Sequence, residues 1–142
     1  MLQGPRATIR EPWTLELSKQ SIGRAGEFQA AAIFERHGIV TTHVDIYGVD
    51  LWCQTPSGRR VSVQVKATQK PTASGQHTTP RYAFQLRLRE DNLADVYCLI
   101  VLDQSLFRLF SASELTRTTT KKISALQFTE DAMLTDIKRY LY

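Results

Sequence analysis

Apolar residues recur at helical spacing in one stretch of the chain, which predicts its longest helix. The segment GRAGEFQAAAIFERHG carries apolar residues every three or four positions. Ser18 and Ser21 lie before it, and either hydroxyl can accept a hydrogen bond from an amide of the first helical turn. Gly38 follows the segment, and glycine suits the left-handed residue after a helix. We therefore expect a helix that begins near Ser18 or Ser21 and ends at Gly38.

A change to β-type residues after Gly38 predicts short strands. The segments IVTTHVDI, VDLWCQ and RVSVQVKA are rich in β-branched residues. Residues 55–58, Thr-Pro-Ser-Gly, have turn chemistry between the second and third segments and predict a hairpin. In the third segment three valines alternate with Ser62, Gln64 and Lys66, so that a valine face would meet the core and a polar face would point the other way.

The second half of the chain predicts a loop, three strands and a helix. Gly, Pro, Ser and Thr gather in residues 69–80, which indicates a long exposed loop. Alternating or wholly apolar patterns predict strands over residues 82–89, 95–102 and 106–111. Ser111 and Glu114 have the spacing of a capping box, and residues 129–142 predict a C-terminal helix, because acids begin the segment and bases end it. Residues 123–128 are ambiguous.

The order of these elements predicts an α+β protein. We expect one domain over residues 18–142, preceded by an N-terminal arm over residues 1–17, because the first fourteen residues contain two prolines and no clear period. The chain has 142 residues, of which 42% are hydrophobic and 23% charged, enough for one buried core.

Charge and cysteine content narrow the function classes only a little. A net charge of +4 favours polyanionic partners, although many basic proteins bind none. Cys53 and Cys98 do not form a zinc motif and fit a reducing compartment. The longest apolar run, residues 96–102, is too short to cross a bilayer. We expect an intracellular, cytoplasmic protein with no membrane partner.

Four polar residues form a candidate site. Glu27 shares a helical face with Ala30, Ala31 and Phe34, and a carboxylate at the rim of a buried stripe needs a partner unless it reaches water. The predicted hairpin brings three more residues, Asp50, Gln64 and Lys66, to one end of the sheet. Each of these residues alone is typical of a solvated side chain, so the prediction depends on their conjunction.

The oxygen atoms of this set are the ligands that Mg²⁺ prefers, and Mn²⁺ is a related choice. Asp50, the Gln64 amide oxygen and the Val65 carbonyl would bind the ion. Lys66 would position or deprotonate the attacking water, or offset charge on a phosphate. Asp45 is a rival for the metal-binding acid; Asp50 is preferred because it begins the strand paired with the one that carries Gln64 and Lys66.

The same residues resemble the signature of the PD-(D/E)XK nuclease superfamily. Helical Gly23-Arg24-Ala25-Gly26-Glu27, then Val49-Asp50, then Gln64-Val65-Lys66 follow its helical Glu, strand Asp and (E/D/Q)-x-K order. The resemblance implies a restriction-endonuclease-like core, a central mixed β-sheet flanked by helices. It also implies metal-dependent hydrolysis of DNA phosphodiester bonds that leaves a 5′-phosphate. The implied catalytic residues are Glu27, Asp50, Gln64 and Lys66, with Glu27 also a metal ligand.

Gln64 departs from the acid that most members have at that position. It resembles the group I intron-associated homing endonuclease branch, where a Gln replaces that acid, which favours site-specific cleavage of a homing or restriction type. Gln64 keeps an oxygen acceptor but removes a negative charge, so the number of bound ions stays open. Three alternatives remain: a Holliday junction resolvase-like enzyme, a catalytically inactive DNA-binding module of the same fold, and an unrelated α+β domain.

Binding to DNA phosphates requires Lys and Arg side chains. The candidates, each of which alone is typical of a solvated face, are Arg59, Arg60, Lys70, His77, Arg81, Arg87 and Arg89. His77 has a second interpretation as a general base or ligand. Cleavage of both strands, or of a junction, requires two active sites, so we expect a homo-oligomer, a dimer or tetramer, with the arm and the aromatic C-terminus as contact surfaces.

Overall fold

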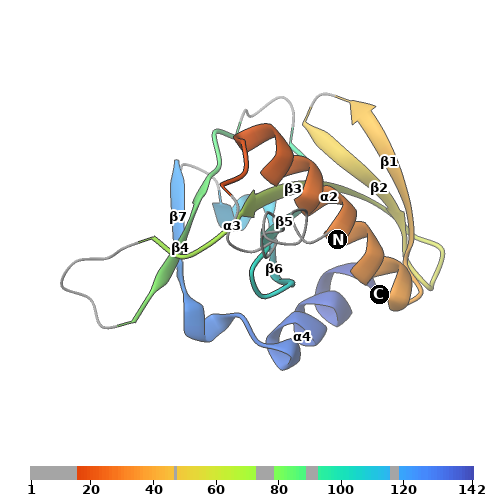
Figure 1. Ribbon diagram of the computed structural model, residues 1–142. Coiled ribbons are helices and arrows are strands. Elements are labelled where there is room, and N and C mark those ends of the chain that lie inside the picture. Colours follow the sequence, from red (N-terminus) through yellow and green to blue (C-terminus); the bar gives the residue numbers. More distant parts are fainter. Residues whose placement is uncertain (1–15, 47, 73–78, 89–92, 116–118) are drawn as a thin grey trace, which may run out of the picture.

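A computed structural model describes residues 16–46, 48–72, 79–88, 93–115 and 119–142 (Figure 1). Residues 1–15 of the predicted arm lie outside this range, as do two of the predicted DNA-binding residues, His77 and Arg89. The elements are α2 (Lys19–Arg36), β1 (Val40–Ile46), β2 (Val49–Gln54), β3 (Arg60–Thr68), β4 (Arg81–Gln85), β5 (Val96–Val101), β6 (Leu106–Ser111), α3 (Ala112–Leu115), β7 (Thr120–Ser124), the 3-10 turn η2 (Ala125–Gln127) and α4 (Glu130–Leu141).

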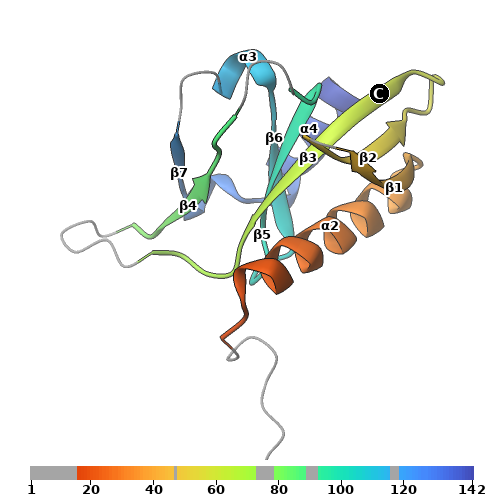
Figure 2. The ribbon, with the colours of Figure 1, turned by 90° about the horizontal axis from the view of Figure 1, so that it is seen from above.

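The strands form two sheets. The larger sheet has the order β1-β2-β3-β5-β6, and its neighbours are antiparallel except for the parallel pair of β3 and β5. The smaller sheet is an antiparallel pair of β4 and β7. Figures 1 and 2 place this pair beyond one end of β3, on the opposite side of the molecule from β1 and β2. The predicted α+β class with a mixed central sheet is therefore confirmed.

Helix α2 begins and ends as the sequence predicts. The Ser18 hydroxyl accepts a hydrogen bond of 3.1 Å from the amide of Ser21, which assigns Ser18 as the N-cap. The helix ends at His37, and Gly38 follows in the left-handed conformation at φ +79°. Ala30 and Phe34 are buried, as expected, whereas Glu27 is half-buried at the edge of their stripe.

Gly26 allows α2 to lie directly on the sheet. A Cβ atom at Gly26 would stand 2.6 Å from the Cβ of Ala67, 3.2 Å from Ile100 and 3.5 Å from Val65. A Cβ–Cβ separation of 2.6 Å is a steric clash, and neither atom can rotate away because both are fixed to the backbone. This approach brings the turn of α2 that contains Glu27 against the face of β3 that carries Val65 and Ala67.

The two faces of the larger sheet enclose different cores. On one face, the valines of β3 at positions 61, 63 and 65 pack with apolar residues of α2 and α4. On the other, Tyr97 and Leu99 of β5 pack with Tyr82 and Phe84 of β4. The long helices thus contribute to one face, while the β4–β7 pair contributes Tyr82, Phe84 and Ile123 to the other, together with Leu115 of α3.

Most of the strand predictions are confirmed, with one change of extent. The β2–β3 hairpin forms, with Leu51 opposite Val63 and Gln54 opposite Arg60. All six residues of β5 are buried, in agreement with its apolar sequence. The strand expected over 82–89 ends instead at Gln85, where the pairing with β7 ends. The ambiguous residues 123–128 divide between the end of β7 and η2.

Asp136 attaches α4 to the edge strand β6. Its Oδ2 atom accepts a hydrogen bond of 2.9 Å from the amide of Leu109 and pairs with Arg108 Nε at 2.8 Å. Asp136 is buried, and buried carboxylates need such compensation. The contact satisfies a backbone amide of an edge strand that would otherwise be open to pairing with another chain.

Candidate active site

Asp50 lies where β2 and β3 separate. The paired register of the two strands runs from Gln54 opposite Arg60 to Leu51 opposite Val63. Asp50 directly precedes Leu51 in β2 and so lies just beyond the last paired residues. Its Oδ2 atom accepts a hydrogen bond of 2.8 Å from the backbone amide of Val65. A side-chain carboxylate therefore takes the place of a backbone acceptor at this point and is held against the strand that carries Lys66.

Lys66 is half-buried and lies within electrostatic range of Asp50 and Arg87. Burial, which removes water from the ammonium group, lowers the pKa of Lys66 from its ordinary value. The carboxylate of Asp50 opposes this shift, and the guanidinium of Arg87 adds to it. Lys66 therefore interacts electrostatically with both side chains. Because its pKa is lowered, Lys66 takes up its neutral form more readily than an exposed lysine does.

Arg87 reaches this group from a different part of the chain. It is exposed and follows β4, with the backbone in the left-handed region at φ +43°. This conformation is uncommon for a residue with a side chain, and such residues concentrate at functional sites. The sequence predicts Arg87 only as a DNA contact, whereas the structure brings it to Lys66.

Glu27 comes to β3 from the helix. Gly26, directly before it, faces the side chains of Val65 and Ala67, which a Cβ atom at this position would meet and which flank Lys66 in the sequence. Successive residues of a strand point to opposite faces, so Lys66 leaves β3 on the other side from those two residues. The structure therefore places Asp50 and Arg87 within electrostatic range of Lys66 and places the turn that contains Glu27 on the opposite face of β3, while the catalytic role of Glu27 stays a prediction.

Gln64 and Val65 complete the predicted oxygen ligands. Gln64 is half-buried and shares a face of β3 with Lys66. Val65 has a buried side chain and donates its amide to Asp50, which leaves its carbonyl as the predicted ligand. Asp45, the rival acid, belongs to β1, and its side chain is outside the described part of the structure. The metal-binding roles of these residues stay predictions.

The donor chemistry fits one hard cation better than two. Among the residues that the structure describes, no three His, Cys, Asp or Glu side chains come together in a group able to hold a metal ion. Mg²⁺ is commonly bound by one or two carboxylates, completed by waters and substrate phosphate. Asp50 supplies a carboxylate, and Gln64 with the Val65 carbonyl supplies neutral oxygens.

Ser62, the third polar residue of β3, has a structural role. Its amide and hydroxyl both donate to Asp95 Oδ2, at 2.9 and 3.1 Å. The amide of Asp95 in turn donates to the Ser62 hydroxyl at 2.9 Å. These bonds align the start of β5 with β3, so the polar face of β3 is structural at one end and available for chemistry at the other.

Arg59 and Arg60 lie away from Lys66, at the hairpin end of β3. The six residue steps from Arg60 to Lys66 span about 20 Å of extended strand. Arg59 Nη2 donates hydrogen bonds of 3.2 Å to the main-chain oxygens of Tyr140 and Tyr142, where a cation is favourable at the end of α4. The structure thus separates these two arginines from the candidate site.

Two other predicted DNA-binding residues lie on the opposite side of the molecule from the hairpin. Lys70 is exposed and pairs with exposed Glu16 at 3.3 Å. Arg81 is half-buried on β4, and its Nε atom is buried without a hydrogen-bond partner among the described residues. Both belong to segments that flank or form the β4–β7 pair.

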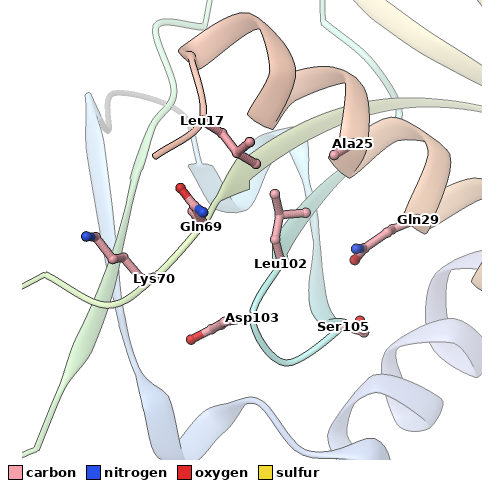
Figure 3. A pocket seen from close by; sticks show the side chains of 8 residues that line it. All are labelled: Leu17, Ala25, Gln29, Gln69, Lys70, Leu102, Asp103 and Ser105. Atoms are coloured by element: carbon pink, nitrogen blue, oxygen red, sulfur yellow. The ribbon is translucent and has the colours of Figure 1, made fainter. Parts of the chain in front are cut away.

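A cavity of about 550 Å³ lies next to the end of β3 (Figure 3). Its described lining residues are Leu17, Ala25, Gln29, Gln69, Lys70, Leu102, Asp103 and Ser105. They come from α2 and the residues before it, the residues after β3 and the turn after β5, so no local sequence signal could reveal the cavity. Asp50, Gln64 and Lys66 do not line it.

Comparisons with known proteins bear on the fold. No model of a protein family matches the chain, and no curated protein matches its sequence. The fold is similar to that of a bacterial homing endonuclease, I-Ssp6803I, with a TM-score of 0.63 and 20% sequence identity. The match covers 76% of this chain and 76% of that chain. The expected nuclease-like fold is therefore confirmed, while membership of the PD-(D/E)XK superfamily stays a prediction.

None of the helices in the described part of the chain is long and apolar enough to span a bilayer.

Proposed function

We propose that the protein is a metal-dependent endodeoxyribonuclease that hydrolyses DNA phosphodiester bonds at specific sites, as homing or restriction enzymes do. The observation that carries this proposal is that Asp50, held by the Val65 amide where β2 and β3 separate, lies within electrostatic range of Lys66, as does Arg87. A fold similar to that of a bacterial homing endonuclease supports it. One acid grouped with two cations suits a phosphodiester substrate, because the cations can offset the charge of the phosphate.

Lys66 and Arg87 would have different roles in hydrolysis of the phosphodiester. A lysine with a lowered pKa is a better proton acceptor near neutral pH, so Lys66 would orient the attacking water and take its proton. Arg87 is permanently charged and would stabilise negative charge that develops on the phosphate oxygens. The Val65 amide holds Asp50 in place, so that its carboxylate does not swing away when substrate binds.

Asp50, with the Gln64 amide oxygen and the Val65 carbonyl, would hold Mg²⁺ or Mn²⁺, and Glu27 is a further candidate ligand. When bound, such an ion polarises a phosphate oxygen and lowers the pKa of a coordinated water. The small negative charge of the protein ligands favours a site completed by the substrate phosphate.

One such site cuts one strand. Cleavage of both strands of a duplex would therefore need two copies of the chain, and we propose a homo-oligomer, a dimer or a tetramer.

A catalytically inactive DNA-binding module of the same fold is the second candidate. The neutral Gln64, and the lack of a three-ligand group among the described side chains, favour it. A module of this kind would bind DNA with steep salt dependence and cut nothing.

The test is a cleavage assay on linear genomic DNA, supercoiled plasmid and a synthetic four-way junction, with Mg²⁺, Mn²⁺ or EDTA. The variants are Asp50→Asn and Lys66→Met, with Lys138→Met as a control at an exposed lysine of α4. We expect metal-dependent cutting that falls by about 100-fold or more in both site variants, the usual scale for loss of a catalytic acid or base. The control should cut like the unmodified protein.

The other results have defined meanings. Salt-sensitive binding without cutting would establish the inactive module, and preference for the junction would establish a resolvase-type enzyme. Equal cutting by the Lys66→Met and Lys138→Met variants would contradict the proposed site.

A further inference from the structure

The β4–β7 ribbon, defined as Arg81–Gln85 paired with Thr120–Ser124, has one apolar and one polar face. Residues directly opposite in an antiparallel pair point to the same side. The pairs Arg81–Ser124, Ala83–Lys122 and Gln85–Thr120 therefore share one face, here called the outer face. Gln85 and Lys122 are exposed on it, and the other four residues are half-buried.

The opposite face anchors the ribbon to the protein. Tyr82, Phe84 and Ile123 are at most 2% exposed. The rings of Tyr82 and Phe84 pack against Phe128, at centroid distances of 5.1 and 6.3 Å. The Tyr82 hydroxyl also donates to Asp103 at 3.0 Å. The outer face is consequently presented on a rigid support, which lowers the entropy cost of binding a partner.

The ribbon is positively charged. Its two strands contain three of the 18 Lys and Arg residues, Arg81, Lys121 and Lys122, and none of the 14 Asp and Glu residues. Arg81 and Lys122 belong to the outer face, whereas Lys121 shares the opposite face with Phe84 and lies over the Phe110 ring. An outer face with cations and no acids is suited to a polyanionic partner.

From this charge, shape and side-chain chemistry we infer that the outer face of the ribbon enters the major groove of duplex DNA and reads base edges. The inference deepens the proposed nuclease function and rests on it for the choice of DNA. The major groove is about 12 Å wide and admits a two-stranded ribbon. Five extended residues span about 17 Å, and this length covers about five base-pair steps of 3.4 Å.

The side chains of the outer face have the chemistry of base readout. Thr120 Oγ1 donates to Gln85 Oε1 at 3.4 Å, which orients the amide while one lone pair and both N–H groups stay available for an adenine edge. Lys122 is suited to the O6 and N7 atoms of guanine. Ala83 lies between the two polar pairs and is small enough to contact a thymine methyl group.

The ribbon is continuous with the candidate active site. Gln85 ends β4, and Arg87, two residues later, interacts with Lys66. Bases read by the outer face would therefore lie near the phosphate that is cut. Loss of Gln85 or Lys122 should change which sequence is chosen, whereas loss of Lys66 should change only whether it is cut.

The test measures binding separately from cutting. Anisotropy of a short fluorescein-labelled DNA duplex in EDTA gives affinity at several salt concentrations, and selection from a randomised duplex library gives sequence preference. The variants are Gln85→Ala and Lys122→Ala, and the matched control is Lys138→Ala at an exposed lysine. Circular dichroism verifies folding. We expect affinity for the selected sequence to fall about 10-fold or more for each ribbon variant and to hold for the control.

Each outcome separates the two proposals. Ribbon variants that lose affinity support the inference, even if the unmodified protein binds DNA and cuts nothing, a result that would remove the nuclease function alone. Ribbon variants that bind and select like the control overturn the inference, whether or not the protein cuts. Equal affinity for an RNA duplex of the same sequence also overturns it, because the deep, narrow groove of A-form RNA excludes a ribbon.

Discussion

The carboxylate of Asp50 accepts a hydrogen bond of 2.8 Å from the amide of Val65, at the point where β2 and β3 stop pairing. The contact joins an acid from one strand to the strand that carries Lys66. Backbone geometry, rather than a pair of flexible side chains, thus sets the distance between the acid and the lysine. The predictions below test this arrangement and the packing that supports it.

Lys66 should lower the stability of the fold at neutral pH. Its pKa is lower in the folded protein than in the unfolded chain, so between these two pKa values the unfolded chain binds more protons and stability rises with pH. Below that window the partly desolvated ammonium is destabilising. Lys66→Met should therefore raise Tm at pH 7, by a margin that narrows as the pH approaches 10.5, the ordinary lysine value.

Thermal melts followed by circular dichroism, with Lys138→Met as the exposed control, measure this difference. A lower Tm for Lys66→Met at pH 7 would show that the pair with Asp50 outweighs desolvation, contrary to the prediction.

Substitution by alanine should change the stability of the protein in opposite directions at two glycines of α2. Gly26→Ala places a Cβ 2.6 Å from that of Ala67, so the helix must move away from β3 at a cost of about 1–3 kcal/mol. Gly23→Ala meets nothing within 4 Å and should gain up to about 1 kcal/mol of helix stability. Urea unfolding of both variants provides the comparison, and equal effects would mean that α2 does not lie this close to β3.

Asp136→Ala should be among the more damaging substitutions in the chain. It leaves the half-buried Arg108 without its partner and removes the acceptor of the Leu109 amide, a loss of about 3–5 kcal/mol for a buried pair. Asp131→Ala, at an exposed position in the first turn of α4, should cost about 1 kcal/mol or less. Denaturant unfolding tests the difference, and similar values for the two variants would contradict a structural role for Asp136.

Arg59→Ala should affect stability rather than DNA binding. The side chain donates to the main-chain oxygens of Tyr140 and Tyr142, so its removal should destabilise the protein by about 1 kcal/mol. Its position at the far end of β3 predicts the same DNA affinity as for the exposed control Lys138→Ala. A selective loss of affinity for the Arg59 variant would restore the sequence-based interpretation of this residue as a DNA contact.

Local signals made part of the fold predictable. Ser18 and Gly38 mark the ends of α2 because capping depends on neighbouring residues, and the turn at residues 55–58 defines the β2–β3 hairpin in the same way. The pairing of β4 with β7 has no such signal, since the partners are far apart in the sequence and Ile123 is the one buried residue of β7.

The candidate site is likewise predictable from the sequence only where its residues are brought together by local structure. Asp50, Gln64 and Lys66 come from one hairpin, so their proximity follows from local pairing. Arg87 reaches Lys66 only through the packing of β4, and Arg59 finds its partners some eighty residues away. Residue type and spacing indicated basic side chains for DNA, whereas tertiary structure decided which of them lie near the chemistry.

The parallel pairing of β3 and β5 has a consequence for how the protein could be retargeted. A parallel pair requires the chain to return to the starting end of the sheet, and β4 lies within that return path between Thr68 and Val96. The bonds between Ser62 and Asp95 close the path at its base. Residues on the outer face of β4 can therefore be substituted as a group, while the hydrogen bonds between β2 and β3 that position Asp50 and Lys66 are unchanged.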